Sequence, residues 1–448
     1  MILLGKRGLV KPPVGKLIGT ALRRCRDAEV VWEERTEIDL AQPLSPRESA
    51  GWGLRVNQEG RSGWTWANLE DSPENLLERA VHDAKTSSKD SILFSHGLPF
   101  TGHSVVPDVI EPEPHVYRLS KLVDRLRFLM PSIIPGRALS IGASLLIQKM
   151  CLITRAGEQY GQRIVYTINV KANEGLPLST QLVASRLRES PADILMSLAW
   201  RSAHSEEIKS APEGFQASVF TEDATGAILR DMVKDHFDAS NFLKEPEKAA
   251  PWGETWLHED ITIMDDGTLS SGPGSGPFDG EGVKKRPVSL VQSGVVHHHI
   301  ADRYHAKQLG VDAAGLAVRD WGKPPRPGYS NLAMVPGDQT LGELARKIGN
   351  GVILDFLAPC DAPREHGEFC RVAQIAFRVQ NGRPTHRLEP FLVRGRFTDI
   401  LGKGLLGVGA ERLWNLRCFT PPVATAGVIC EPLPSGLTVN DERCGSWW

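Results

Sequence analysis

The spacing of apolar residues predicts alternating helical and extended segments in the N-terminal part of the chain. Residues 14–26 carry apolar positions at helical spacing, whereas residues 28–36 are typical of a strand. Residues 52–56 and 64–66 alternate apolar and polar positions like two paired strands. The intervening residues 57–61 contain the Asn and Gly that a hairpin turn favours. This region therefore predicts an antiparallel sheet accompanied by helices.

The pattern continues up to a predicted domain boundary at Pro212. A helix is expected to open at Ser72-Pro73, because serine accepts hydrogen bonds from free amide groups and proline suits the first helical turn. The stretch 86–114 is rich in Pro, Gly, Ser and His and is typical of a connection. Further elements are predicted at residues 72–85 (helix), 115–130 (helix), 162–173 (strand) and 192–209 (helix).

Beyond the boundary the pattern becomes mostly extended. A short strand at 215–220 precedes a helix at 222–237. Short strands separated by Gly and Pro follow from Leu257 onward, including a pairing around Asn381-Gly382. Two helical interruptions are predicted in this later part, at 341–348 and 397–401. The chain is therefore expected to be an α+β protein. Its N-terminal domain (residues 1–212) combines an antiparallel sheet with helices, and its C-terminal domain (residues 213–448) is mostly β and barrel-like.

Charge and composition narrow the classes of function. The 448 residues carry 52 Lys and Arg against 54 Asp and Glu, without the clustered basic surface that nucleic-acid binding requires. No apolar run is long enough to cross a bilayer, so we expect no membrane partner. The seven cysteines form no C-x-x-C pair, which favours reduced thiols in a cytoplasmic protein.

Histidines are the first place to look for catalytic chemistry. His258-Glu259 has no second histidine at helical spacing, so we interpret it as the exposed start of a strand. In the cluster 297–299, a strand would point His297 and His299 to one face. These histidines could form a metal site, or they could belong to a polar strand that lines a cleft or an interface. We favour the second interpretation. His366 stands among acidic residues in a segment typical of a loop.

Other familiar motifs are missing or incomplete. The segment 272–277 (GPGSGP) invites a phosphate-loop interpretation. However, residues 277–282 (PFDGEG) follow it, and their carboxylates would repel a pyrophosphate. The sequence contains no G-x-S-x-G nucleophile elbow, and no cysteine has the basic neighbourhood of a reactive thiolate. Residue chemistry alone therefore shows no catalytic centre.

Four stretches, in order, resemble the TldD/PmbA family. The most recognisable is an Asp-rich turn that leads to an Asp-x-Glu-Gly sequence, here Asp279-Gly280-Glu281-Gly282. Together the stretches span most of the chain. They comprise residues 28–35 with 51–64, 265–269 with 274–282, 293–296 with 306–310, and 336–344.

In this family, TldD-type chains carry a zinc-binding H-E-x-x-x-H helix after the strand that opens the C-terminal domain. The corresponding segment here is identified as residues 221–226, in which Glu222 is retained. Thr221 and Gly226 stand where the two histidines would be, and neither residue can replace an imidazole ligand. The pattern therefore resembles the PmbA (or TldE) type, whose members lack the motif. We expect no metal in this chain.

The resemblance implies a partner and a shared function. It implies a heterodimer in which a TldD-type catalytic subunit supplies zinc, and which cuts unfolded peptides or processes peptide-derived natural products. In that assembly this chain would be a non-catalytic subunit that contributes to a cavity wall. Our candidates for a substrate- or interface-facing role are Asp279, Glu281, His297, His299 and His366.

Two alternative functions remain open at this point. The chain could itself be a small-molecule amide hydrolase or a tailoring enzyme of natural-product biosynthesis that uses His297, His299 or His366. It could also be a scaffold without associated hydrolysis. Neither the substrate nor the choice between a homodimer and a heterodimer can be deduced from the sequence.

Overall fold

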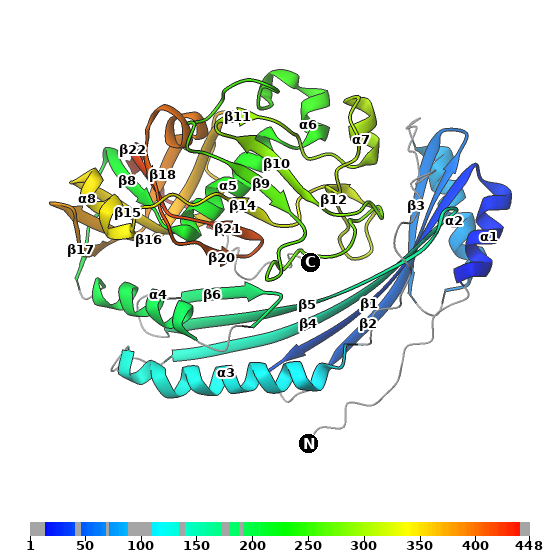
Figure 1. Cartoon of the computed structure of the whole chain (residues 1–448), viewed down its shortest axis with the longest axis horizontal. Helices are drawn as coiled ribbons and strands as arrows, with labels where there is room; N and C mark the ends of the chain where they lie inside the picture. The colour runs from blue at the N-terminus through cyan, green and yellow to red at the C-terminus, as the bar shows by residue number, and fades with distance from the viewer. Residues whose placement is uncertain are drawn as a thin grey trace.

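A long curved sheet runs beneath a second, rounder part of the molecule (Figure 1). The structure is a computed structural model. It describes residues 14–40, 46–68, 71–87, 110–133, 139–172, 179–187, 191–205 and 207–439. Only the backbone is described at positions 14, 139, 172, 179–181 and 192–193. Most of the connection predicted at 86–114 lies outside the described residues.

The first sheet has six strands in the order β3-β2-β1-β4-β5-β6, and all neighbouring strands are antiparallel. Its strands are β1 (Asp27–Asp39), β2 (Arg47–Gln58), β3 (Arg61–Asn68), β4 (Leu139–Thr154), β5 (Gly157–Ala172) and β6 (Ser179–Ala184). The predicted hairpin is confirmed as β2–β3. Its two turn residues, Glu59 and Gly60, have φ angles of 52° and 82°, as the tight hairpin turns require.

Helices cover this sheet at both ends. The helices are α1 (Val14–Arg24), α2 (Pro73–Thr86), α3 (Pro112–Ile133) and α4 (Ala192–Ala203). Apolar residues of α1 and α2 form one core with β1–β3, and those of α3 and α4 form another with β4 and β5. Ser72 caps α2 as predicted, because its hydroxyl accepts a hydrogen bond from the Asn75 amide at 3.2 Å.

Helix α4 is shorter than the sequence predicts. It ends at Ala203 instead of residue 209, where Ser205 donates its hydroxyl to the Arg201 carbonyl. The chain then forms β7 (Ile208–Lys209), which pairs in parallel with β17 (Arg383–Leu388). Tertiary pairing with the second half of the molecule thus replaces the last helical turn.

The C-terminal part contains a closed barrel, which confirms the predicted barrel-like architecture. Five strands follow one another in the order β15-β8-β22-β18-β16, and β16 pairs back with β15 to close the ring. The strands are β8 (Gly214–Phe220), β15 (Gly351–Pro359), β16 (Glu368–Gln380), β18 (Phe391–Arg396) and β22 (Val423–Glu431), with β19 (Leu405–Val408) paired to β22. The β16–β17 turn at Asn381-Gly382 lies where the sequence predicts it.

A second six-stranded sheet packs beside the barrel in the order β11-β10-β9-β14-β21-β20. Its strands are β9 (Ile263–Asp266), β10 (Pro287–Gln292), β11 (Val295–Val296), β14 (Leu332–Met334), β20 (Leu413–Asn415) and β21 (Cys418–Thr420), and a small pair β12 (Ala317–Val318) with β13 (Arg326–Pro327) lies nearby. Helix α5 (Glu222–His236) shares a single apolar core with both sheets.

Shorter helices complete the fold. Helix α8 (Leu341–Ile348) is confirmed, with a Thr340–Glu343 capping box, and the segment predicted at 397–401 forms the π-helix η2 (Asp399–Lys403). The sequence predicts only these two helices after Leu257. This prediction was wrong, because a further helix, α7 (Arg303–Gln308), begins after Asp302, whose side chain caps it. The others are α6 (Ala239–Lys244) and η1 (Pro246–Lys248).

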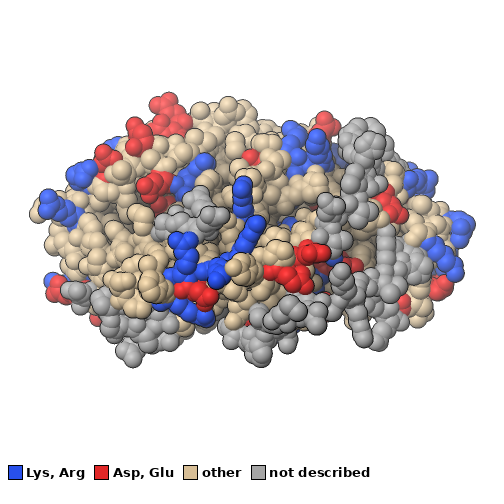
Figure 2. Space-filling model, turned by 60° about the horizontal axis from the view of Figure 1, so that its bottom comes forward, with Lys and Arg blue, Asp and Glu red and all other residues tan. Residues whose placement is uncertain are grey.

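The surface carries charge of both signs. On the face that Figure 2 brings forward, basic side chains gather near the middle and acidic side chains lie beside them. No helix in the described part of the chain is both long and apolar enough to cross a membrane.

Candidate functional site at the start of helix α5

A cleft lies where strand β8 ends and helix α5 begins. Acidic residues in this first turn face the positive end of the helix dipole, which favours carboxylates there. The cleft opens to solvent, and the space between its atoms is about 900 Å³ with open solvent included. We call it the Glu222 cleft and define it by Glu222, Asp223, Arg201, Asp355, Trp414 and Phe419.

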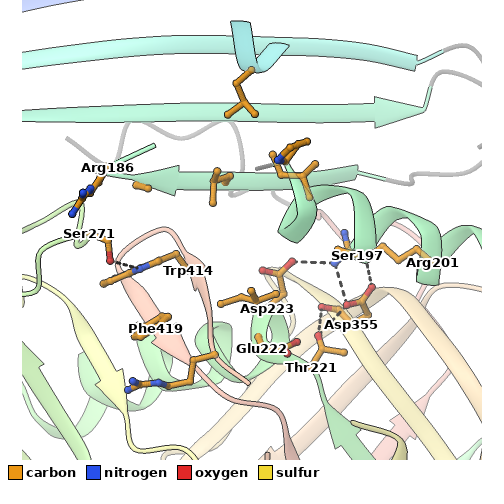
Figure 3. Close-up of a pocket in the computed structure, with 17 residues that line it drawn as sticks. Arg186, Ser197, Arg201, Thr221, Glu222, Asp223, Ser271, Asp355, Trp414 and Phe419 are labelled. Carbon is orange, nitrogen blue, oxygen red and sulfur yellow. Dashed lines mark hydrogen bonds and ion pairs between the residues drawn. The ribbon is translucent and has the colours of Figure 1, made fainter. Parts of the chain in front are cut away.

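A buried ion-pair network forms the floor of this cleft (Figure 3). Arg201 of α4 donates through Nη2 to Asp355 Oδ1 at 3.0 Å and to Asp223 Oδ2 at 3.1 Å. The side chains of Arg201 and Asp355 are only 3% and 5% exposed. Burial alone would lower the pKa of Arg201, but Asp355 and Asp223 more than compensate and raise it. The network therefore joins helix α4, in the N-terminal part of the chain, to helix α5 and strand β15 in the C-terminal part.

Thr221 belongs to the same network. It occupies the N-cap position of α5, but its hydroxyl makes no capping hydrogen bond to the helix. Instead, Thr221 Oγ1 donates to Asp355 Oδ1 at 2.9 Å. The side chain is thus directed toward the ion pair, away from the helix amides.

Glu222 stands beside this network as the titratable group of the cleft. Burial raises the pKa of its carboxyl to about 7, and the carboxylates of Asp355 and Asp223 add to the effect. Burial also raises the pKa of Asp223, although Arg201 opposes the change. Glu222 is therefore poised to gain or lose a proton near neutral pH.

The remaining walls are aromatic and apolar. Trp414 of β20 stacks on Phe419 of β21 with ring centroids 4.8 Å apart, and Arg412 lies 4.3 Å above the Phe419 ring. Trp414 also donates its indole N–H to Ser271 Oγ at 3.1 Å. The N-terminal half contributes Leu122, Leu182 and Ile194. A ligand here would contact both halves of the molecule.

The residues at the start of α5 do not fit a zinc ion. Gly226 has no side chain, and a Cβ placed there would lie 3.3 Å from both Cys418 Cβ and Thr420 Oγ1. Arg230 Nη1 approaches the Cys418 sulfur at 3.9 Å, which places a cation beside that thiol. The described residues contain no group of three or more His, Cys, Asp or Glu side chains arranged to hold a metal.

The two acidic candidates, Asp279 and Glu281, lie in residues 272–282, which we call the Gly-rich turn. Both are buried and bonded to other parts of the chain. Asp279 accepts hydrogen bonds from the amides of Glu281, Val283 and Ala317. Glu281 forms an ion pair with Arg55 at 3.1 Å and accepts from the Arg303 amide at 2.7 Å. Burial raises the pKa of Asp279 to about 7. These contacts hold the turn against the N-terminal sheet.

The histidine candidates lie in three different surroundings. The prediction that His297 and His299 share one face of a strand was wrong, because β11 ends at Val296. His297 is exposed, whereas His299 is buried among aromatic rings and donates to the Ala250 carbonyl at 3.1 Å. Burial lowers the pKa of His299 to about 4. His366 contacts the Lys248 carbonyl at 2.8 Å. None of the three is among the described residues that line the Glu222 cleft.

Of the positions named from the sequence, only Thr221, Glu222 and Asp223 of segment 221–226 are among the described residues that line this cleft. Sequence reasoning missed Arg201, Asp355, Trp414 and Phe419. Asp355 carried a usable signal, since it is the one charged residue in the apolar strand Gly351–Pro359 and a buried carboxylate needs a partner. The other three are separated from it in sequence and meet it only in the fold.

Comparison with known proteins identifies the C-terminal part first. Residues 216–430, from strand β8 to strand β22, match a family model described as the PmbA/TldA metallopeptidase C-terminal domain. The C-terminal part of the chain is therefore similar to the PmbA/TldD metallopeptidase family. The matched range contains α5, Asp355, Trp414 and Phe419, which form most of the Glu222 cleft.

Relatives in the PmbA/TldD family extend the similarity beyond this domain. A metalloprotease of Methanothermobacter thermautotrophicus is 33% identical over 201 residues, which are 45% of this chain but only 44% of that protein. A metalloprotease of Methanocaldococcus jannaschii is 20% identical over 398 residues, which cover 84% of this chain and 88% of the relative. The crystal structure of TldE from Thermococcus kodakarensis has a TM-score of 0.77 at 19% identity, covering 93% of this chain and 99% of that one. That structure shares the complete fold.

Proposed function

We propose that this chain is a non-catalytic, PmbA/TldE-like subunit of a heterodimeric zinc-dependent peptidase or amide hydrolase. A TldD-type partner would bind the zinc ion. The substrates would be unfolded peptides or intermediates of peptide-derived natural products. This chain would contribute the Glu222 cleft and its aromatic wall to the cavity that receives them.

One observation carries the proposal, namely the environment of Thr221 and Gly226. The family resemblance places the two histidines of TldD-type chains at these positions, and each residue makes a different contact here. Thr221 bonds to Asp355, and Gly226 packs closely against Cys418. Neither position gives Glu222 a neighbouring imidazole that could hold a metal ion beside its carboxylate. The fold shared with TldE is a further support.

The experiment is metal analysis combined with light scattering, on the full chain alone and after co-expression with a TldD-type chain. We expect the isolated chain to be zinc-free and the complex to be a heterodimer with about one zinc ion, as a catalytic site with three protein ligands holds. Peptide hydrolysis should require the complex. Stoichiometric zinc in the isolated chain would overturn the proposal, and an inactive complex would favour a scaffold.

A second candidate function rests on the pKa of Glu222. A carboxyl that titrates near 7 in a cleft can act as a general acid or base, so this chain could carry an amide-hydrolase activity of its own. The test is hydrolysis of amide and peptide substrates by the isolated chain and its Glu222→Gln variant. Activity that the variant loses would establish this candidate, whereas activity confined to the complex would exclude it.

A further inference from the structure

A second cleft, on the other side of the Gly-rich turn, is dominated by cations. It lies between strands β4 and β5 of the N-terminal sheet, residues 274–280, and the β20–β21 turn. It opens to solvent, and the space between its atoms is about 650 Å³ with open solvent included. We call it the basic cleft and define it by Arg163, Lys285, Arg319 and Arg417.

The four cations come from separate parts of the fold. Arg163 projects from β5, where its Nε donates to Gln148 Oε1 at 2.8 Å, and Arg417 lies in the β20–β21 turn. Lys285 donates from Nζ to the Gly274 carbonyl at 2.7 Å. Arg319 is held more firmly, with its side chain 2% exposed and ion-paired to Glu29. The N-terminal sheet and the C-terminal domain thus both contribute basic side chains to the basic cleft.

Acidic side chains balance this charge only in part, since Glu33 and Asp265 act on Arg163 and Lys285 from outside the lining of the cleft. Among the described lining residues, Asp279 is the acidic one, and three backbone amides already occupy its carboxylate. Burial lowers the pKa of Arg163 to about 9, and the charges of Arg417 and Arg35 contribute. Burial also lowers the pKa of Lys285 to about 8, with Arg163 adding to the effect. The cations therefore repel one another and would be stabilised by an anion.

We propose that the basic cleft binds a carboxylate carried by an apolar group. Arg163 and Arg417 offer planar guanidinium groups, whose forked N–H donors match the two oxygens of a carboxylate. Met150, Phe278 and Val318 line the same cleft and supply contacts for the apolar part of the ligand. A peptide C-terminus and a free aliphatic acid share this chemistry. The inference involves neither zinc nor a partner chain, so it stands or falls separately from the proposed subunit role.

The experiment is isothermal titration calorimetry of the full chain with four probes. These are N-acetyl-dileucine with a free C-terminal carboxylate, the same compound as its C-terminal amide, hexanoate and inorganic phosphate. We expect the free carboxylate to bind about tenfold or more tightly than the amide, because the amide lacks the charge. A preference for N-acetyl-dileucine over hexanoate identifies a peptide terminus as the source, and the opposite preference identifies a free aliphatic acid.

Variants test whether these cations form the site. Arg163→Gln and Arg417→Gln should each weaken carboxylate binding by about tenfold or more. The exposed Arg346→Gln, which makes the same chemical change on helix α8, should leave binding unchanged. Two variants on different elements keep the test decisive if one of them fails to fold, which circular dichroism would show. Equal binding of the amide, preference for phosphate, or unchanged affinity in both variants would overturn the proposal.

Proton linkage provides an independent readout. Lys285 is surrounded by Arg163 of β5, Arg417 of the β20–β21 turn, Asp265 of β9 and Asp279 of the Gly-rich turn. A bound carboxylate raises the pKa of this lysine, so the protein should take up protons on binding between about pH 8 and 9. Titrations in two buffers of different ionisation enthalpy measure this uptake. Proton release or no exchange in that range would contradict the proposal.

Discussion

The Glu222 cleft and the basic cleft both lie between the N-terminal sheet and the C-terminal part of the chain, but their charged side chains are arranged differently. In the first, Arg201 lies between the carboxylates of Asp355 and Asp223 and is paired with both. In the second, Arg163 and Lys285 lie close to other cations. The pKa of Arg201 is accordingly raised above its ordinary value, whereas those of Arg163 and Lys285 are lowered.

This difference separates a cation held between two carboxylates from cations that face one cleft together. An ion pair within the chain connects two elements of the fold, and its carboxylate favours the charged form of the basic side chain. Like charges gathered in one cleft lower the stability of the folded state, and such an arrangement is typical of functional sites. Removing a charge should therefore have opposite consequences in the two clefts.

The largest effect is expected at Asp355. The Asp355→Ala variant leaves the Arg201 guanidinium buried without its main partner and removes the acceptor of Thr221. Breaking a buried pair from one side costs about 3–5 kcal/mol, so the urea midpoint should fall strongly. Equilibrium unfolding followed by tryptophan fluorescence and circular dichroism measures it.

An exposed ion pair supplies the control for this variant. Asp399 and Lys403 are separated by 3.0 Å, and their side chains are 42% and 83% exposed. Asp399→Ala should change stability by no more than about 1 kcal/mol, because exposed pairs contribute little. If both variants behaved alike, the Arg201 network would not be the structural connection that we describe.

Glu222 shows how an unpaired carboxyl behaves beside the same network. Its pKa is raised to about 7, so its contribution to stability is fully present below its ordinary pKa of 4.5 and is lost as the pH rises through about 7. Glu222→Gln removes this loss. The variant should match the wild type near pH 4.5 and exceed its stability by on the order of 2 kcal/mol at pH 8.

Urea unfolding of both proteins at several pH values measures the difference. The exposed Glu389→Gln variant controls for the loss of one negative charge and should follow the wild type at each pH. A Glu222→Gln variant that is less stable than the wild type at pH 8 would show that the charged carboxylate supports the fold.

The sequence predicted the architecture well where the pattern is local. Strand alternation, the Ser72-Pro73 cap and the Asn381-Gly382 turn each depend on neighbouring residues, and all three are observed. The end of α4 was wrong, because the pairing of β7 with β17 is a tertiary contact across more than a hundred residues.

The site was harder to predict, for the same reason. The family resemblance led to segment 221–226, where the Glu222 cleft begins. The partners of that segment come from α4, β15 and β20, and no spacing along the chain connects them. The histidine cluster 297–299 gave the opposite error, because residues that are adjacent in sequence do not form one site. His297 is exposed to solvent, whereas His299 is buried.

The smallest effect should be found at Arg163, and its sign distinguishes the two clefts. Arg163→Gln removes one of several mutually repelling cations, so in buffer without carboxylates the variant should be more stable than the wild type by on the order of 1 kcal/mol at pH 7. Thermal unfolding in a zwitterionic buffer measures this, with Arg346→Gln as the matched control. Saturating N-acetyl-dileucine should then reverse the order, because a ligand stabilises only the protein that binds it. A variant less stable than the wild type in both conditions would place Arg163 with the structural cations, alongside Arg201.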